Sequence, residues 1–271
     1  MTLGDVLGLS AEYLDGKGVD TPRLDAELLL AKALGLSRLD LYLHHDRPLN
    51  ETERNAVRTL IRRRGEREPL AYVLGDWGFR RLTLKTDHRA LVPRPETEML
   101  VERSLELLRG VDAPRVLDVG TGSGAIALAI ADEHPGARVV GLDASAAALA
   151  LARENAELTG IAIELVEGDA TAALPAGPFD LVVSNPPYVF EHEQLPPELD
   201  HEPDMALYGD GHTRAIAEHA RDVLDGPLVL EVHSEQANAV ADLLRSLGYA
   251  DVRISRDLTG RDRVVEGRWR Q

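Results

Sequence analysis

The chain has 271 residues and a mass of 29.6 kDa, which suits two domains better than one. Its 44% hydrophobic and 28% charged residues are typical of a globular protein with a sizeable core and exclude a disordered or fibrous chain. It has no cysteine, which excludes disulfides, thiolate metal sites and thiol nucleophiles. No apolar run approaches the roughly 18–20 residues of a membrane span, and the N-terminus lacks the features of a signal peptide. We therefore expect a cytoplasmic protein without a membrane association.

Acidic residues are concentrated in the C-terminal two-thirds of the chain. Residues 1–84 contain 13 basic and 13 acidic residues, whereas residues 85–271 contain 17 basic and 33 acidic residues. The whole net charge of −16 therefore belongs to the second part. A protein that binds nucleic acid needs a basic surface to neutralise phosphates. The charge distribution disfavours a nucleic-acid substrate.

Helical patterns cover the first ~75 residues. Apolar side chains recur at helical spacing after Thr21-Pro22, and proline suits the first turn of a helix. A further helix is predicted from Glu51 to Arg64. One of its faces is apolar and the other carries arginines, as solvated helix faces do: Arg54, Arg58, Arg62, Arg63 and Arg64. We assign residues 1–74 to a small helical domain and residues 75–90, with a short hairpin, to a linker.

From Arg115 onward, strands alternate with helices. Strands are predicted over residues 115–120, 137–143, 161–169, 179–188, 227–233, 249–255 and 262–269, and helices over 123–134, 145–158 and 234–247. This alternation predicts an α/β domain with a mostly parallel sheet covered on both faces. Only a turn-rich stretch separates the last two strands, so we expect them to pair antiparallel at the sheet edge.

A glycine-rich loop follows the first of these strands. It contains Asp118, Gly120, Thr121, Gly122, Ser123 and Gly124. Glycines allow backbone N–H groups to approach a ligand at the start of a helix, and Asp143, at the end of the next strand, is placed to bind ribose hydroxyls. The spacing fits the dinucleotide fingerprint of dehydrogenases, but Asp-x-Gly-x-Gly-x-Gly also resembles the loop of S-adenosylmethionine-dependent methyltransferases. The resemblance of loop and strand order favours a methyltransferase.

The tetrapeptide Asn185-Pro186-Pro187-Tyr188 follows the fourth strand, at the edge where open α/β sheets bind ligands. The prolines remove two N–H donors and stiffen the backbone, so carbonyl acceptors remain. Asn185 adds a side-chain acceptor and Tyr188 a flat ring. Two acceptors and a ring suit a planar –NH2 group.

Four motifs together carry a family resemblance. They are Gly75-x-x-x-Phe79, the stretch Leu91 to Glu98, Asn185-Pro186-Pro187-Tyr188, and Glu202-Pro203-x-x-Ala206-Leu207. In this order, behind a small helical domain, they resemble the PrmC/HemK family of release-factor glutamine N5-methyltransferases. The resemblance implies a Rossmann-like class I methyltransferase domain at 91–271, with a seven-stranded, mostly parallel sheet and an antiparallel last strand. It also implies S-adenosylmethionine as cofactor and an N-terminal domain that docks the substrate.

The implied substrate is the glutamine of the Gly-Gly-Gln motif in class 1 peptide-chain release factors, modified by a monomeric enzyme. The resemblance also implies residue roles. The catalytic residues would be Asn185, Pro186 and Tyr188. The cofactor would be bound by Asp118, Gly120, Thr121, Gly122, Ser123, Gly124, Asp143, Asp169, Ala170 and Asn185. The substrate would be bound by Asn185, Pro186, Pro187, Tyr188, Phe79, Arg94 and Glu96. One departure concerns the adenine contact. The family often has an aromatic residue shortly after the acid that Asp169 matches, whereas this chain has Ala170, Thr171 and Ala172.

Two other functions compete with this reading. A nucleic-acid adenine N6-methyltransferase uses the same four residues, but the acidic charge of residues 85–271 disfavours it. A non-catalytic adenosyl-binding module would not need the acceptors of Asn185 and Pro186. The nine histidines show no metal-ligand spacing, so no metal site is predicted.

Overall fold

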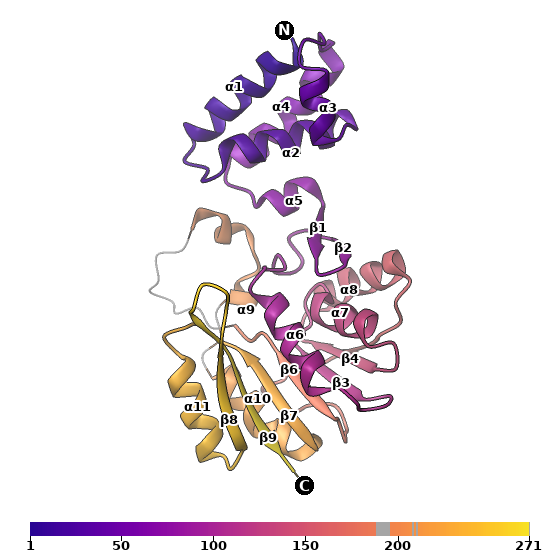
Figure 1. Cartoon of the computed structure of the whole chain (residues 1–271), viewed down its shortest axis with the longest axis vertical. Coiled ribbons are helices and arrows are strands. Elements are labelled where there is room, and N and C mark those ends of the chain that lie inside the picture. Colours follow the sequence, from indigo (N-terminus) through magenta and orange to yellow (C-terminus); the bar gives the residue numbers. More distant parts are fainter. Residues whose placement is uncertain (188–195, 208, 210, 271) are drawn as a thin grey trace. The chain divides into compact units, whose positions relative to one another are not determined.

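The structure is a computed structural model, and it describes all residues except 188–195, 208, 210 and 271 (Figure 1). The described residues form two compact units, one comprising Met1–Asp76 with residues 196–201 and the other the remainder from Trp77 onward. None of the helices in the described ranges is both long and apolar enough to cross a bilayer.

The first unit is helical. Its helices are α1 (Leu3–Asp15), α2 (Pro22–Leu34), α3 (Arg38–Leu43), α4 (Glu51–Gly65) and α5 (Leu70–Leu74), with a 3-10 turn at Pro197–His201. Thr2, Ser37 and Asn50 cap α1, α3 and α4 in reciprocal capping boxes, which explains where these helices begin. Apolar side chains from all five helices form one buried core.

Arg64 of α4 differs from the solvated residue expected on its helix face. Its side chain is only 7% exposed and donates to Asp25, with 2.7 Å between Nε and Oδ2. It also donates to Glu198, which Arg67 contacts as well. A buried guanidinium needs such partners, because an unpaired charge in the interior is strongly destabilising.

The second unit is built on a seven-stranded sheet with the order β5-β4-β3-β6-β7-β9-β8 (Figure 1). Its strands are β3 (Arg115–Val119), β4 (Arg138–Asp143), β5 (Glu164–Glu167), β6 (Leu181–Ser184), β7 (Gly226–Glu231), β8 (Ala250–Arg256) and β9 (Asp262–Trp269). Its helices are α6 (Thr97–Leu107), α7 (Ala125–Glu133), α8 (Ala146–Thr159), α9 (Asp204–Leu207), α10 (His212–Val223) and α11 (Ala237–Ser246). The hairpin β1 (Asp76–Phe79) and β2 (Leu82–Lys85) forms a separate small sheet.

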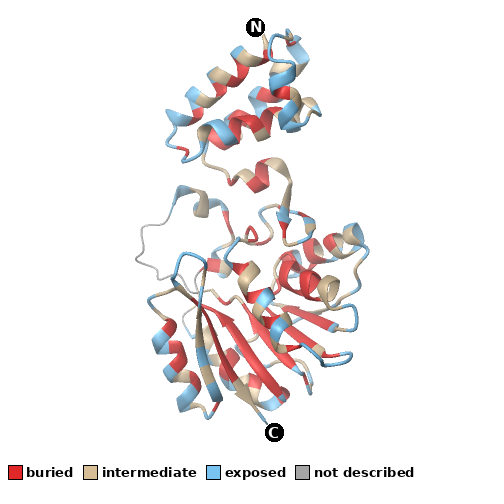
Figure 2. Ribbon diagram, in the orientation of Figure 1, coloured by how far each residue is buried: buried red, intermediate tan, exposed pale blue. Residues whose placement is uncertain are grey.

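Successive side chains of the central strands enter two cores on opposite faces of the sheet, as strand geometry requires. Leu117 and Val182 pack with α10 and α11, whereas Val116 and Val183 pack with α6 and α7. β6 and β7 are buried along their whole length (Figure 2). Strands buried on both faces read as continuous apolar runs, which is the pattern of FDLVVS and PLVLEV.

The predicted fold class is confirmed, including the antiparallel pairing of the last two strands. The last strand itself does not form the edge. β9 lies between β7 and β8 and pairs antiparallel with both, so β8 is the edge strand.

Candidate active site

A cavity of about 380 Å³ opens at the carboxyl ends of β3, β4 and β6. Strand order reverses direction at β3, whose neighbours are β4 and β6, and open α/β sheets bind ligands at such switch points. Ser184, the last residue of β6, donates from Oγ to the Val119 carbonyl of β3 at 2.7 Å. This buried bond joins the strand that precedes the glycine loop to the strand that precedes Asn185.

The glycine loop lines the cavity from Val119 to Ser123. Gly120, Gly122 and Gly124 have φ of +74°, +54° and +81°, a region that other residues rarely adopt. A Cβ on Gly120 would meet no protein atom within 4 Å, whereas one on Gly124 would press against Ala152 of α8 at 3.2 Å. Gly120 therefore leaves room for a ligand, and Gly124 allows α7 and α8 to pack closely.

Asp143, at the end of β4, lines the same cavity. Its Oδ2 accepts the N–H of Gly122 and its Oδ1 accepts the N–H of Ser145, both at 2.8 Å. Each carboxylate oxygen retains acceptor capacity beyond these bonds. Asp143 is thus held rigidly by the loop on one side and by the start of α8 on the other, with capacity to bind a diol.

Asp118 and Gly124 are the predicted cofactor contacts that are not among the residues lining the cavity. Asp118 is fully buried. Its Oδ2 accepts the Thr121 hydroxyl at 2.6 Å and the Ala127 N–H at 3.2 Å. Burial raises the pKa of Asp118 to about 7, against the opposing effect of these two donors. Through these contacts the buried Asp118 side chain stabilises the glycine loop and the start of α7.

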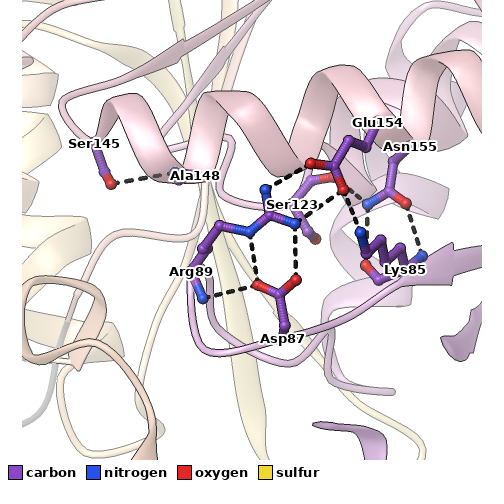
Figure 3. Close-up of polar contacts among 8 residues, drawn as sticks. All are labelled: Lys85, Asp87, Arg89, Ser123, Ser145, Ala148, Glu154 and Asn155. Atoms are coloured by element: carbon purple, nitrogen blue, oxygen red, sulfur yellow. Dashed lines mark hydrogen bonds and ion pairs between the residues drawn. The ribbon is translucent and has the colours of Figure 1, made fainter. Parts of the chain in front are cut away.

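A polar network that the sequence did not reveal supports the glycine loop from α8 (Figure 3). Asn155 is 0% exposed; its Oδ1 accepts the Lys85 N–H, and its Nδ2 donates to the carbonyls of Lys85 and Ser123. Arg89, which lines the cavity, donates hydrogen bonds to the carboxylates of Asp87 and Glu154. The segment after β2 and the glycine loop are therefore fixed to one helix. Helical spacing alone placed Asn155 on α8 without indicating this contact.

Asn185 and Pro186 line the same cavity as the glycine loop, together with Pro187. The Nδ2 of Asn185 donates to Oγ1 of Thr97 at 3.3 Å, and Thr97 is a buried residue in the first turn of α6. With its N–H2 group engaged there, Asn185 has Oδ1 left as an acceptor to which no other described residue donates. Thr97 belongs to the Leu91–Glu98 motif, but sequence reasoning missed its role. Tyr188 lies outside the described residues.

Two segments of the cavity wall are joined through Glu202. Its carboxylate, 0% exposed, accepts the Val92 N–H at 3.0 Å and forms an ion pair with Arg94. Val92 and Arg94 line the cavity, as does Pro203. Burial raises the pKa of Glu202, while Arg94 opposes that effect. Arg94 is therefore engaged within the wall.

The remaining predicted site residues fall into two groups. Asp169 and Ala170 line the cavity, close to the carboxyl end of β5. Phe79 is 1% exposed in the core against α6 and α7, and Glu96 is exposed; neither lines the cavity. Within the described part of the chain, no three His, Asp or Glu side chains are grouped as metal ligands.

Known proteins match both units. A family model of the PrmC N-terminal domain matches residues 5–75, and a model of the methyltransferase small domain matches residues 96–239. The release factor glutamine methyltransferase of Deinococcus radiodurans is 44% identical, with 99% of each chain covered. That of Geobacter sulfurreducens is 43% identical, with 98% of this chain and 96% of the relative covered. The chain belongs to this family.

The family membership makes the chain a methyltransferase and confirms the predicted enzyme class and its cofactor, S-adenosylmethionine. Two solved structures match the fold alone. A T. thermophilus 16S rRNA methyltransferase, determined with S-adenosylmethionine and guanosine, is 21% identical and has a TM-score of 0.53; 72% of this chain and 50% of that chain are covered. A methyltransferase from Pyrococcus furiosus is 19% identical with a TM-score of 0.50, and the coverage is 69% and 89%.

The cavity fits this cofactor. Its volume lies within the ~300–1,000 Å³ typical of small-molecule sites. The open space at Gly120 and the diol-binding capacity of Asp143 suit a nucleoside, and the apolar wall includes Leu142, Ala148 and Ile216. The residues that would hold the cofactor are therefore the glycine loop, Asp143 and the wall near Asp169.

Proposed function

We propose that this methyltransferase modifies the side-chain amide nitrogen, N5, of the glutamine in the Gly-Gly-Gln motif of class 1 peptide-chain release factors. Relatives named release factor glutamine methyltransferase, 37–44% identical over nearly the whole chain, support this substrate. The observation that carries the proposal is Asn185, which lines the same cavity as the glycine loop. Its N–H2 group is engaged by Thr97, and among the described residues none donates to its Oδ1. The enzyme would act in the cytoplasm, where release factors function.

The chemical task is to make a poor nucleophile react. The lone pair of an amide nitrogen is delocalised into its carbonyl, so the nitrogen gains positive charge when it forms a new bond. S-adenosylmethionine, when bound, supplies a methyl group activated by a positively charged sulfur. Asn185 Oδ1 and the Pro186 carbonyl would accept the two N–H groups of the glutamine amide and stabilise the charge that develops on them.

The rigidity of this turn matters as much as its polarity. Two prolines restrict the backbone, the Ser184 hydroxyl donates to the Val119 carbonyl, and the Asn185 side chain donates to Thr97. The acceptors would therefore be in place before the substrate arrives. Such preorganised groups stabilise a transition state without reorganising. The proton that the methylated amide loses is acidic at that stage and passes to solvent.

The proposal is tested by Asn185→Ala with labelled S-adenosylmethionine and full-length release factor. We expect transfer to slow by ~10²–10³, the effect of losing one preorganised polar contact. The affinity for S-adenosylhomocysteine should change little, because the residues that would bind it are the glycine loop after β3 and Asp143 at the end of β4, whereas Asn185 follows β6. A release factor with glutamate in place of the motif glutamine is the matched substrate control.

Three results would contradict the proposal. Transfer at the wild-type rate by Asn185→Ala would remove Asn185 from the chemistry. Methylation of the glutamate control would show that another residue is modified. Methylation of DNA or RNA but not of release factor would favour the adenine N6-methyltransferase instead.

A further inference from the structure

The cavity has an unusual wall at the end near Asp169. Among its described lining residues there is no Phe, Tyr or Trp, and Ala170 follows the acid. A purine base is commonly covered by a flat side chain, because an extended ring makes more contact with the base than an aliphatic group does. His212 is the one conjugated ring among those described lining residues.

His212 begins α10, and this helix runs beside the Asp169 segment. His212, Ile216 and His219 follow the i, i+4, i+7 spacing of one helix face. His212 and Ile216 line the cavity, and His219 hydrogen-bonds through Nε2 to the Thr171 carbonyl at 3.2 Å. The segment from Asp169 to Thr171 therefore lies along this face of α10: Thr171 contacts His219, and Asp169 lines the cavity together with His212 and Ile216.

The charge of Asp169 is consistent with this position. Its pKa lies below the ordinary value, mainly because Thr171 donates two hydrogen bonds to its Oδ1, with a smaller contribution from His212. His212 thus lies within electrostatic reach of this carboxylate.

The ring of His212 packs closely against Gly209 and Pro187. A Cβ on Gly209 would lie 2.6 Å from His212 Nδ1 and 2.4 Å from Pro187 Cγ, so these three residues are closely packed. Nδ1 is shielded from solvent. His212 is also one of the residues that line the cavity.

We infer that His212 covers the adenine base of S-adenosylmethionine and replaces the aromatic contact that is missing after Asp169. This rests on the proposed site, in which Asp143 binds the ribose. The base is attached to that ribose and extends from Asp143 toward Gly168, Asp169 and Ala170, all of which line the cavity with His212. The side chain selects a flat base at this end and takes no part in methyl transfer.

The test is calorimetric and needs no activity. Wild type, His212→Ala and His212→Phe are titrated with S-adenosylhomocysteine and with 5′-methylthioadenosine, which keeps the adenine and ribose but lacks the amino-acid part. His212→Ala should weaken both ligands by the same factor, about 5- to 100-fold, the range for losing a stacking partner. His212→Phe should bind both nearly as well as wild type, because it keeps a flat ring.

His219→Ala is the matched control, since it removes a histidine from the same helix face outside the cavity. We expect its affinities to equal those of the wild type. Equal losses in His212→Ala and His219→Ala would overturn the inference in favour of helix docking. So would unchanged binding by His212→Ala, or a loss confined to S-adenosylhomocysteine, which would place the ring at the amino-acid end. A wild-type protein that binds neither ligand would overturn the proposed function itself, a result separable from all of these.

Discussion

Thr97 offers the most specific test of the site, because it determines which way the Asn185 amide points. Thr97→Val keeps the shape of a side chain that is 5% exposed but removes Oγ1, the acceptor for Asn185 Nδ2. Without that acceptor, the amide can rotate and present N–H donors to the glutamine nitrogen, where an acceptor is needed. The substitution therefore acts on Asn185 through its orientation.

The expected magnitude follows from the length of this bond. At 3.3 Å it is longer than the ~2.9–3.0 Å usual for N–H···O bonds, which places it at the weak end of ~0.5–1.5 kcal/mol. Leaving the partly buried N–H2 group without a partner adds to the loss, to about 1–2 kcal/mol in total. We expect kcat to fall ~5- to 30-fold, less than in Asn185→Ala because the acceptor remains present part of the time.

The assay is transfer of labelled methyl groups to release factor, with kcat and KM determined separately. KM for release factor and the affinity for S-adenosylhomocysteine should remain within about twofold of wild type, because Thr97 orients a group that acts only during transfer. Thr97→Ser, which keeps the hydroxyl, should restore most of kcat. Wild-type kcat in Thr97→Val, or an equal defect in Thr97→Ser, would refute the reasoning. Denaturant unfolding of both variants separates this effect from a loss of stability at the start of α6.

Two further predictions concern the cofactor side. Asp143→Ala should weaken S-adenosylhomocysteine binding by roughly 1.5–3 kcal/mol, as for charge-assisted hydrogen bonds, and calorimetry showing wild-type affinity would remove Asp143 from the site. Because burial raises the pKa of Asp118 to about 7 from an ordinary value of 3.8, the folded chain holds a proton there that the unfolded chain releases. The free energy of unfolding should therefore fall by up to about 4 kcal/mol as pH rises from 4 through 7, and Asp118→Asn should remove that part of the slope in denaturant titrations. Identical slopes in variant and wild type would contradict the raised pKa.

The sequence alone determined the parts of the site that depend on local pattern. Gly120 and Asn185 each follow an apolar strand, Asp143 is the last residue of one, and the carboxyl ends of parallel strands meet at one edge of a sheet. Their convergence on one cavity therefore required only that the strands be parallel, which the alternation of strands and helices indicated. The cofactor and the reaction class followed from the resemblance of these short motifs to those of a known family.

Only the tertiary structure decided which residues support those motifs. Thr97 and Asn185 are 88 residues apart, and Asn155 reaches a carbonyl 32 residues away; nothing in the local pattern around any of them indicates its partner. The same reason explains why Arg64, on a helix face that looks solvated, is buried against Asp25, and why β9 inserts between β7 and β8. Periodicity specifies which face of an element is apolar, whereas the identity of the partner depends on how distant elements pack. His212 illustrates both, because its helical spacing is visible in the sequence, but its place beside Asp169 arises only when α10 packs on the sheet.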